Sequence, residues 1–523
     1  MTSSGRTRVA ILLAVALILS VLAYSNTFTG EFQFDDDGTV AENPYVTDIG
    51  NFRGLHLKSF VDGIRPVATF TFAVNYYFWG LDVLPYHLTN FAVHAVCGLL
   101  VFYLAFLTAR SPGLLYDESR ARFIALLTSA IFLLHPVQTE SVSYVSQRYE
   151  SIASLFYLAS LIAFVKGRQA AGAPGRYVLY ALSIASGILA LGSKQFAVTL
   201  PLVIILYDFY FLSERPSFKR MAGPLVFLAL AAVAGFIIVK GLKGTDAGFS
   251  VQGVTPWEYL LTQFRAVVTY IRLLFLPAWQ NLDYDFRISR SLLEIDTLLS
   301  FLFLLSLFVS AIFLFRRRRA ASFFILWFFI VLAPTSSIIP IVDPIFEHRV
   351  YLASAGLFFI FSDVLWAALS RAAQGMGRPA RGGTLAISGA LALMLVLSGL
   401  TYERNKVWRT KLSMWLDVAA KSPMKSRPHN NLGNCYMLLD RPFEAIEEYK
   451  KAIALDPGNI EAYYNISLNL EKTGRLDQAA HYYDIFSNNA PPRYEKQKEF
   501  ARKRVERFRE LERLGFAAEK AAP

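Results

Sequence analysis

The stretch "VAILLAVALILSVLAYSNTFTGEFQFDDD", residues 9–37, is an apolar run followed by three consecutive carboxylates, Asp35, Asp36 and Asp37. Its apolar part approaches the roughly 20 residues with which a helix crosses a bilayer. Basic residues precede the run, but no small-residue cleavage site follows it, so we interpret it as a retained first helix and not as a signal peptide. The acidic triplet that follows a membrane segment is the feature to be explained.

The rest of the chain has the same apolar character. Of its 523 residues, 54% are hydrophobic and only 18% are charged, which is typical of a polytopic membrane protein. We therefore predict an all-α membrane helix bundle with about 11 spans. The predicted spans are 9–26, 86–109, 121–136, 149–166, 177–193, 196–212, 221–239, 295–315, 321–340, 350–370 and 384–401.

One further run, 256–276, does not fit this pattern of spans. Its residues Thr262, Arg265, Thr269 and Arg272 recur at steps of three and four and form one polar stripe. We interpret this run as an interfacial or re-entrant helix on the outer side of the membrane. Its two arginines need an anionic partner, or they extend to lipid headgroups.

The net charge of +12 comes from Lys and Arg clusters in the short loops between the apolar runs. This distribution is typical of membrane topology and argues against a nucleic-acid partner. The clusters share one side if the N-terminus is cytoplasmic, and the C-terminal tail then lies outside. The two cysteines, Cys97 and Cys435, predict neither a disulfide nor a zinc site. We expect a multi-pass protein of a bacterial inner membrane with a periplasmic tail.

The tail contains a repeat. Pro423, Pro457 and Pro491 are spaced 34 residues apart, which is the tetratricopeptide period. One repeat starts at Ser426 and a degenerate one at Ile460, and a basic helix from about Arg493 caps the stack. The predicted domains are therefore 1–402, transmembrane, and 403–523, extracytoplasmic repeats. Stacked helix pairs form a concave surface for a peptide or protein partner, although so few repeats could instead only order the chain end.

With the sides assigned in this way, conspicuous polar residues gather near the outer membrane face, where such residues are functional by default. They are Asp35, Asp36, Arg65, Tyr86, His87, Asn90, His135, Glu140, Arg148, Lys194, Asp283, Asp285, Glu347, His348, Arg349 and Tyr351. For His94, deeper in its span, we predict a structural hydrogen bond between helices.

Carboxylates that face Arg and Lys around a membrane-level cleft suit the transfer of a group from a lipid-linked phosphate. One Asp can take the proton of an acceptor hydroxyl as general base, and cations can stabilise the charge of the departing phosphate. Histidines with acids could instead bind a divalent metal, but the sequence contains no tight ligand motif such as HExxH. We therefore predict no metal ligands.

Several stretches resemble the GT-C class of membrane glycosyltransferases, in particular the transmembrane-and-tetratricopeptide family of protein O-mannosyltransferases and its bacterial relatives. They are "FQFDDDGTVAENPYV", "RPVATFTFAVNYYFWGLDVLPYHLTNFAVHAV", "HPVQTESVSYVSQRYESIASLFYLASL", "GSKQFAVTLPLVIILYDF", "LLFLPAWQNLDYDF" and "FEHRVYLASAGL". The resemblance covers nearly the whole chain and implies an inverting transferase. Its donor would be a sugar on a polyprenyl or dolichyl phosphate, and its acceptor a Ser or Thr of a translocated protein. The chain departs from the family pattern at Gln195, where an acid is usual, and at Ala353, where a proline is usual.

The resemblance carries the catalytic base onto Asp35 and Asp36, with Asp35 preferred. The polar constellation supplies the other predicted site residues. For the donor phosphate these are Arg148, Lys194, Arg265, Arg272 and Arg349, and for the substrate pocket Arg65, His87, Asn90, His135, Glu140, Asp285 and Glu347. No cofactor beyond the lipid-linked sugar is expected.

Two other functions fit the sequence. A non-catalytic membrane anchor could use its repeats to scaffold an envelope complex. A transporter or lipid-carrier flippase would usually show inverted repeats and broken helices at the midplane. No internal repeat is visible within these spans, so the transporter ranks last.

Overall fold

The computed structural model describes residues 3–54, 65–170, 172–212, 247–251, 253–375 and 382–520. These residues form helices and loops, and the only β-pairing among them is an isolated bridge between Ala247 and Ile341. The chain divides into two compact units. The N-terminal unit comprises Met1–Gln280 and Phe286–Arg409, and the C-terminal unit comprises Asn281–Asp285 and Thr410–Pro523. The predicted all-α class is confirmed.

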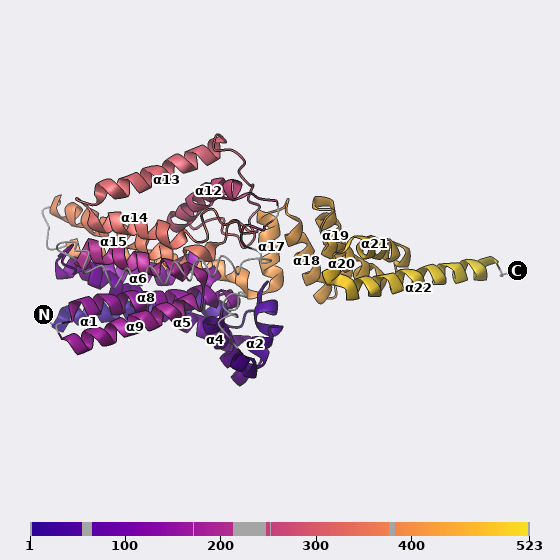
Figure 1. Cartoon of the computed structure of the whole chain (residues 1–523), viewed down its shortest axis with the longest axis horizontal. Coiled ribbons are helices and arrows are strands. Elements are labelled where there is room, and N and C mark those ends of the chain that lie inside the picture. Colours follow the sequence, from indigo (N-terminus) through magenta and orange to yellow (C-terminus); the bar gives the residue numbers. More distant parts are fainter. Residues whose placement is uncertain are drawn as a thin grey trace. The chain divides into compact units, whose positions relative to one another are not determined.

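Most long helices of the N-terminal unit run side by side as a bundle, and α2 and α4 lie at an angle to them (Figure 1). In chain order, its described α-helices are α1 (Ser3–Tyr24), α2 (Pro44–Thr47), α4 (Pro66–Trp79), α5 (Val83–Ala109), α6 (Glu118–Leu134), α7 (Thr139–Val142), α8 (Arg148–Gln169), α9 (Ala173–Leu191), α10 (Leu200–Tyr207), α12 (Pro256–Phe275), α13 (Ile295–Leu314), α14 (Arg319–Leu332), α15 (Tyr351–Gly375) and α16 (Gly382–Asn405). Three short 3₁₀ turns also matter for the site: η5 (Val145–Gln147), η6 (Gln195–Thr199) and η8 (Glu347–Val350).

Eight helical segments in the described part of the chain are long and apolar enough to cross a membrane. They are Thr7–Thr27, Val83–Ala109, Val145–Gln169, Ala173–Leu191, Gln195–Leu212, Ile295–Leu314, Glu347–Gly375 and Gly383–Arg409. A ninth is formed if Glu118–Leu134 and Pro136–Val142, which meet at a bend of 53°, count as one span. The bend lies at His135, which precedes a proline and takes an extended conformation. Each of these segments corresponds to a predicted span.

Two predicted spans do not have such a counterpart. The run 321–340 was too long, because α14 ends at Leu332, just before Pro334 stops the helix, and is only 14 residues long. The predicted span 221–239 lies outside the described residues. The segment 256–276 does form a helix, α12, which begins with a capping box between Thr255 and Glu258. Like the prediction, the structure does not place α12 among the spanning helices.

Helix α6 lies at the centre of the bundle and packs against α1, α5, α15 and α16. Its residues from Phe123 to Leu134 are all buried. A close approach with α5 depends on Gly98, since an added Cβ there would lie 2.4 Å from the Leu133 side chain. Ser129 Oγ uses this proximity to donate to the Gly98 carbonyl over 2.7 Å. The tight packing of α5 and α6 gives the loops at their ends a rigid support.

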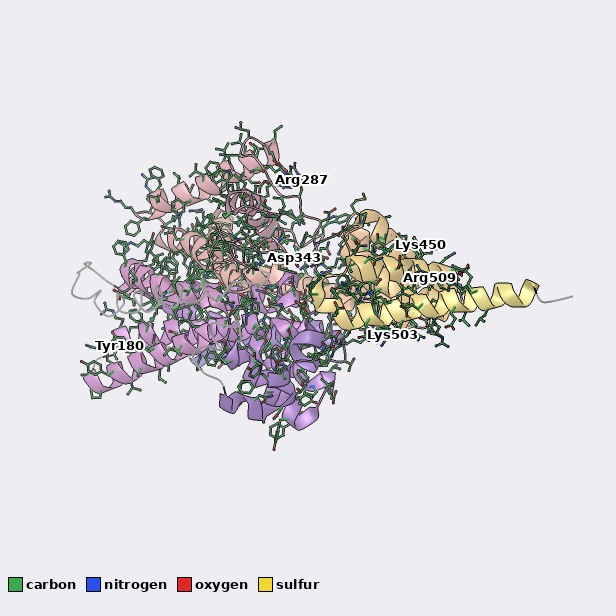
Figure 2. The ribbon with its side chains drawn as sticks, turned by 45° about the vertical axis from the view of Figure 1, so that its right-hand side comes forward. Tyr180, Arg287, Asp343, Lys450, Lys503 and Arg509 are labelled. Carbon is green, nitrogen blue, oxygen red and sulfur yellow. The ribbon has the colours of Figure 1, made fainter. Side chains whose placement is uncertain are left out.

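The C-terminal unit is a stack of helix pairs. Its helices are α17 (Lys411–Lys421), α18 (Ser426–Leu438), α19 (Pro442–Leu455), α20 (Ile460–Lys472), α21 (Leu476–Asn489) and α22 (Glu495–Lys520). Gly433 on α18 lies so close to Tyr449 on α19 that a Cβ would meet its ring at 2.5 Å. As predicted, a final helix packs on the last pair, and exposed charges such as Lys450, Lys503 and Arg509 cover the unit (Figure 2).

Candidate active site

The acidic triplet belongs to a tightly held loop in which neighbouring carboxylates have different surroundings. Asp36 is fully buried, and its carboxylate accepts hydrogen bonds from the backbone N–H of Gln33 (2.8 Å) and of Ser146 (2.6 Å). Between Gln33 and Asp36, Phe34 has a φ of +40°, a value that an aromatic residue rarely adopts. Asp35 is exposed, while its backbone N–H donates to the Tyr144 hydroxyl over 2.8 Å. The loop therefore presents Asp35 and buries Asp36.

Burial raises the pKa of Asp36 to about 7, although the N–H donors of Gln33 and Ser146 oppose this rise. The negative charge of the neighbouring Asp35 adds to it. A carboxyl group with this pKa is poised near neutral pH. However, both of its oxygens already accept backbone hydrogen bonds, so Asp36 is better suited to fixing the loop than to receiving a substrate proton.

The same loop is anchored to the segment that ends the last span. Gln33 donates from Nε2 to the Trp408 carbonyl over 3.3 Å, and the Glu31 N–H donates to the Arg409 carbonyl over 3.1 Å. The Trp408 ring stacks on Tyr144 at 5.6 Å between centroids. These contacts join the loop after the first span to the end of the last span, beside the predicted base.

Residues 144–150, at the start of α8, connect the acidic loop to a group of cations. Tyr144 and Ser146 hold Asp35 and Asp36, as described above. Gln147 and Glu150 both hold Lys194, whose Nζ lies 3.2 Å from Gln147 Oε1 and 2.8 Å from Glu150 Oε2. One short segment therefore contacts both the predicted base loop and a predicted phosphate-binding lysine.

Lys194 lies in the turn between α9 and η6 and is buried. Burial lowers the pKa of Lys194, the Glu150 carboxylate opposes this effect, and the charges of Arg65 and Arg349 lower it further. Lys194, Arg65 and Arg349 thus all lie within electrostatic range of the Glu150 carboxylate, and the two arginines also lie within range of Lys194. Such a cluster can receive a phosphate group.

Arg65 reaches this cluster from the residue before α4. The Val67 N–H donates to the Gly192 carbonyl over 3.1 Å, so the Arg65 segment and the Lys194 turn are joined by their backbones. The Arg65 guanidinium lies over the Tyr149 ring, 4.7 Å from its centroid. Its buried Nε finds no hydrogen-bond acceptor among the described residues, and an anionic ligand could provide one.

A second buried group of charges surrounds η8. Glu140 accepts from His348 Nδ1 over 2.6 Å and from the Glu347 N–H over 3.0 Å. Gln280 donates from Nε2 to Glu347 Oε2 over 2.6 Å.

Arg349 belongs to the same turn. Its guanidinium donates to the carbonyls of Pro344 and of Asp343, which is marked in Figure 2, over 2.8 Å each. The structure thus brings together Glu140, Glu347 and Arg349, which were predicted as site residues.

Arg148 has a different environment from the cations around Glu150. It is fully buried and donates to Asn90 Oδ1 (2.5 Å), Asn75 Oδ1 (2.6 Å) and the Tyr86 carbonyl (2.9 Å). These neutral acceptors from α4 and α5 occupy both arms of its guanidinium. The contacts favour a structural role for Arg148 and Asn90, and their roles at a donor or substrate remain predictions.

The other predicted site residues are spread more widely. His87 donates from Nε2 to the Gly30 carbonyl over 3.0 Å, and His135 to the Leu274 carbonyl over 3.1 Å. Arg265 pairs with Asp296 at 3.0 Å, and Arg272 donates to the Ala278 carbonyl over 2.8 Å.

Asp285 belongs to the C-terminal unit, where its N–H donates to Ser422 Oγ over 3.0 Å. His94 joins helices as predicted, with hydrogen bonds to the Tyr351 hydroxyl and the Leu133 carbonyl.

Sequence reasoning missed Tyr144, Ser146, Glu150 and Gln280. All four lie within stretches that carry the family resemblance, but no local pattern shows their contacts. Among the described residues, no group of three His, Cys, Asp or Glu side chains is arranged to hold a metal ion.

The fold and this site define a multi-pass, all-helical membrane protein with a tetratricopeptide-repeat unit. Two tetratricopeptide repeat models match the chain, one at residues 426–459 and the other at residues 460–484, which confirms both predicted repeat starts. No solved structure matches the chain significantly.

Curated relatives confirm the resemblance to the transmembrane-and-tetratricopeptide family. The chain is 27% identical to the Caenorhabditis elegans protein O-mannosyl-transferase F38B6.6, over 85% of this chain and 63% of that protein. It is 23% identical to the human protein O-mannosyl-transferase TMTC1, over 86% of this chain and 55% of that protein. Human protein O-mannosyl-transferase TMTC3 is 22% identical over 91% of this chain and 55% of its own length. The chain thus spans about 55% to 63% of the length of these relatives.

Proposed function

We propose that this protein is an inverting glycosyltransferase that moves a sugar from a polyprenyl-phosphate carrier to a Ser or Thr hydroxyl of an exported protein. The names of the relatives favour mannose as the sugar. The observation that supports the proposal best is the dual contact of residues 144–150, which hold the acidic loop through Ser146 and Lys194 through Glu150. A base and a phosphate-binding cation are the two groups that this reaction needs.

In the proposed reaction, Asp35 is the general base. Its carboxylate takes the proton of the acceptor hydroxyl while the hydroxyl oxygen attacks the anomeric carbon of the sugar. The bond between that carbon and the phosphate oxygen breaks, and the phosphate leaves with the electron pair. Because the phosphate oxygen has a low pKa, it needs charge stabilisation more than a proton. Arg65, Lys194 and Arg349 would provide that stabilisation.

The repeats would recruit the acceptor protein, because stacked helix pairs offer an extended surface. A bacterial inner membrane, with the N-terminus cytoplasmic and the tail periplasmic, is part of the proposal. The distribution of Lys and Arg among the loops supports the orientation in this proposal.

The test is sugar transfer by the purified full chain from a polyprenyl-phosphate sugar to a Ser/Thr peptide. Asp35→Asn should reduce transfer by about a thousandfold or more, since the base is lost, and should leave membrane expression unchanged. Asp37→Asn is the matched control in the same loop and should retain most activity.

Full transfer by the Asp35→Asn protein would assign the base to another residue. No transfer by the wild type, together with loss of an envelope complex when residues 410–523 are deleted, would instead favour the non-catalytic anchor.

A further inference from the structure

The ion pair between Lys194 and Glu150 lies inside the protein and not at its surface. Both side chains are buried, and their charged atoms are 2.8 Å apart. The acidic partner of Lys194 is Glu150 of α8, 44 positions earlier in the chain. The residue directly after the lysine is Gln195, which carries no charge. An ammonium group has three N–H donors. Glu150 and Gln147 accept from two of them, and the third has no acceptor among the described residues, so it can serve a ligand.

Other charged groups face Lys194 from several elements. Arg65 approaches from the residue before α4, Arg349 and His348 from η8, and Glu140 from α7, and all lie within electrostatic range of Lys194. Burial away from water and the positive charges of Arg65 and Arg349 all disfavour the charged form of Lys194. Glu150, at 2.8 Å, is the acid in direct contact with it.

We propose that Glu150 is a positioning residue that keeps Lys194 protonated and directed toward the phosphate of the lipid-linked donor. This inference rests on the proposed function for the identity of the donor. Glu150 takes no part in breaking or forming bonds. Its carboxylate balances one positive charge, so the cluster of Arg65, Lys194 and Arg349 stays fully charged before the phosphate enters. The phosphate then accepts from the remaining N–H of Lys194.

The variant Glu150→Gln retains the size of the side chain and removes its charge. Without the carboxylate, the pKa of Lys194 falls further, so the lysine loses its proton at a lower pH. Each unit by which the pKa falls reduces the protonated fraction about tenfold at alkaline pH. We therefore expect donor affinity to fall about tenfold or more at pH 9 and much less at pH 6.5.

The first measurement is the affinity of the purified full chain for polyprenyl monophosphate in lipid nanodiscs between pH 6 and pH 9. The second is the KM for the polyprenyl-phosphate sugar over the same range. The double variant Glu150→Gln/Lys194→Arg should regain alkaline binding, because a guanidinium stays charged without the carboxylate. Glu118→Gln is the matched control, since Glu118 forms a surface ion pair with Arg122.

The inference and the proposed function fail in different ways. Equal loss of binding at all pH values in Glu150→Gln, without recovery in the double variant, would show a purely structural role and overturn the inference. Wild-type protein that binds polyprenyl monophosphate with the expected pH dependence but transfers no sugar would overturn the proposed function alone. Wild-type protein that does not bind the monophosphate at any pH would overturn both.

Discussion

The backbone N–H of Ser146 donates to Asp36 Oδ1 over 2.6 Å, across 110 positions of sequence. This bond places the acidic loop, which follows the first span, against the start of α8. Asp36 thus stabilises the fold through its hydrogen bonds, and Asp35 remains exposed beside it. Two neighbours with the same side chain thus have different surroundings, and such differences are what can give paired carboxylates different roles.

The first prediction concerns the pH dependence of stability. Burial raises the pKa of Asp36 from its ordinary value of 3.8 to about 7. In the window between these values the folded protein holds a proton that the unfolded chain has lost. The contribution that protonated Asp36 makes to the free energy of unfolding is therefore fully present below about pH 4. It is lost as the pH rises to about 7. Thermal unfolding of the full chain in detergent, from pH 5 to pH 8, should show a melting temperature that falls across this range.

Asp36→Asn should flatten this dependence, because Asn does not titrate. The variant should also have a lower melting temperature at acidic pH. Each Asp36 oxygen accepts a hydrogen bond from a backbone N–H, and the NH₂ group of the asparagine cannot accept one. Asp48→Asn, at an exposed position, should keep the wild-type slope. Parallel slopes for wild type and Asp36→Asn would contradict the raised pKa.

The second prediction separates a structural from a donor-binding role for Arg148. A lysine at this position cannot reach Asn75, Asn90 and the Tyr86 carbonyl together, because an ammonium lacks the fork of a guanidinium. Arg148→Lys should therefore destabilise the fold by about 3 kcal/mol, the cost of buried acceptors left unpaired. Thermal unfolding and the yield of folded protein measure this loss.

The donor KM of the protein that does fold should stay near the wild-type value. Arg176→Lys provides the control, since Arg176 is exposed. A variant with wild-type stability and a strongly raised donor KM would support the phosphate-binding role of Arg148 and contradict the structural one.

The third prediction concerns Asp283 in the C-terminal unit. Its carboxylate is 2% exposed and pairs with Lys425 and with Arg427, whose Nε donates over 2.7 Å. Asp283→Asn removes the charge that both cations share, and should destabilise this unit by about 1–3 kcal/mol, because the cations are partly exposed. Limited proteolysis of the full chain should then cleave the region from 410 onward more rapidly.

Asp285→Asn is the matched control two positions away, where the side chain is exposed. Its cleavage rate should equal that of the wild type. Equal rates for Asp283→Asn and the wild type would show that the paired charges contribute no net stability.

Much of the fold could be predicted because its signals are local. A spanning helix is recognised by an apolar run, and the repeats by Pro423, Pro457 and Pro491 at a fixed period. The error at 321–340 was also local, since Pro334 ends α14 before the run reaches full length. The bend at His135 likewise follows from the next residue being a proline.

The candidate site was predictable only in part. Asp35 and Asp36 were proposed as site residues through the family resemblance, and Lys194 and Arg349 through their charge. Charge alone did not distinguish Arg148, which neutral acceptors surround, from Lys194, which a carboxylate contacts. Glu150 was missed because its partner is 44 positions away and no repeat or spacing connects the two.

The sequence by itself determined an all-helical membrane protein with two tetratricopeptide repeats, because apolar length and repeat period are properties of neighbouring residues. Only the tertiary structure decided which carboxylate is buried, which is exposed, and which cations surround Glu150. The physical reason is that burial and pairing depend on distances between segments far apart in the chain, and these distances exist only after the helices have packed.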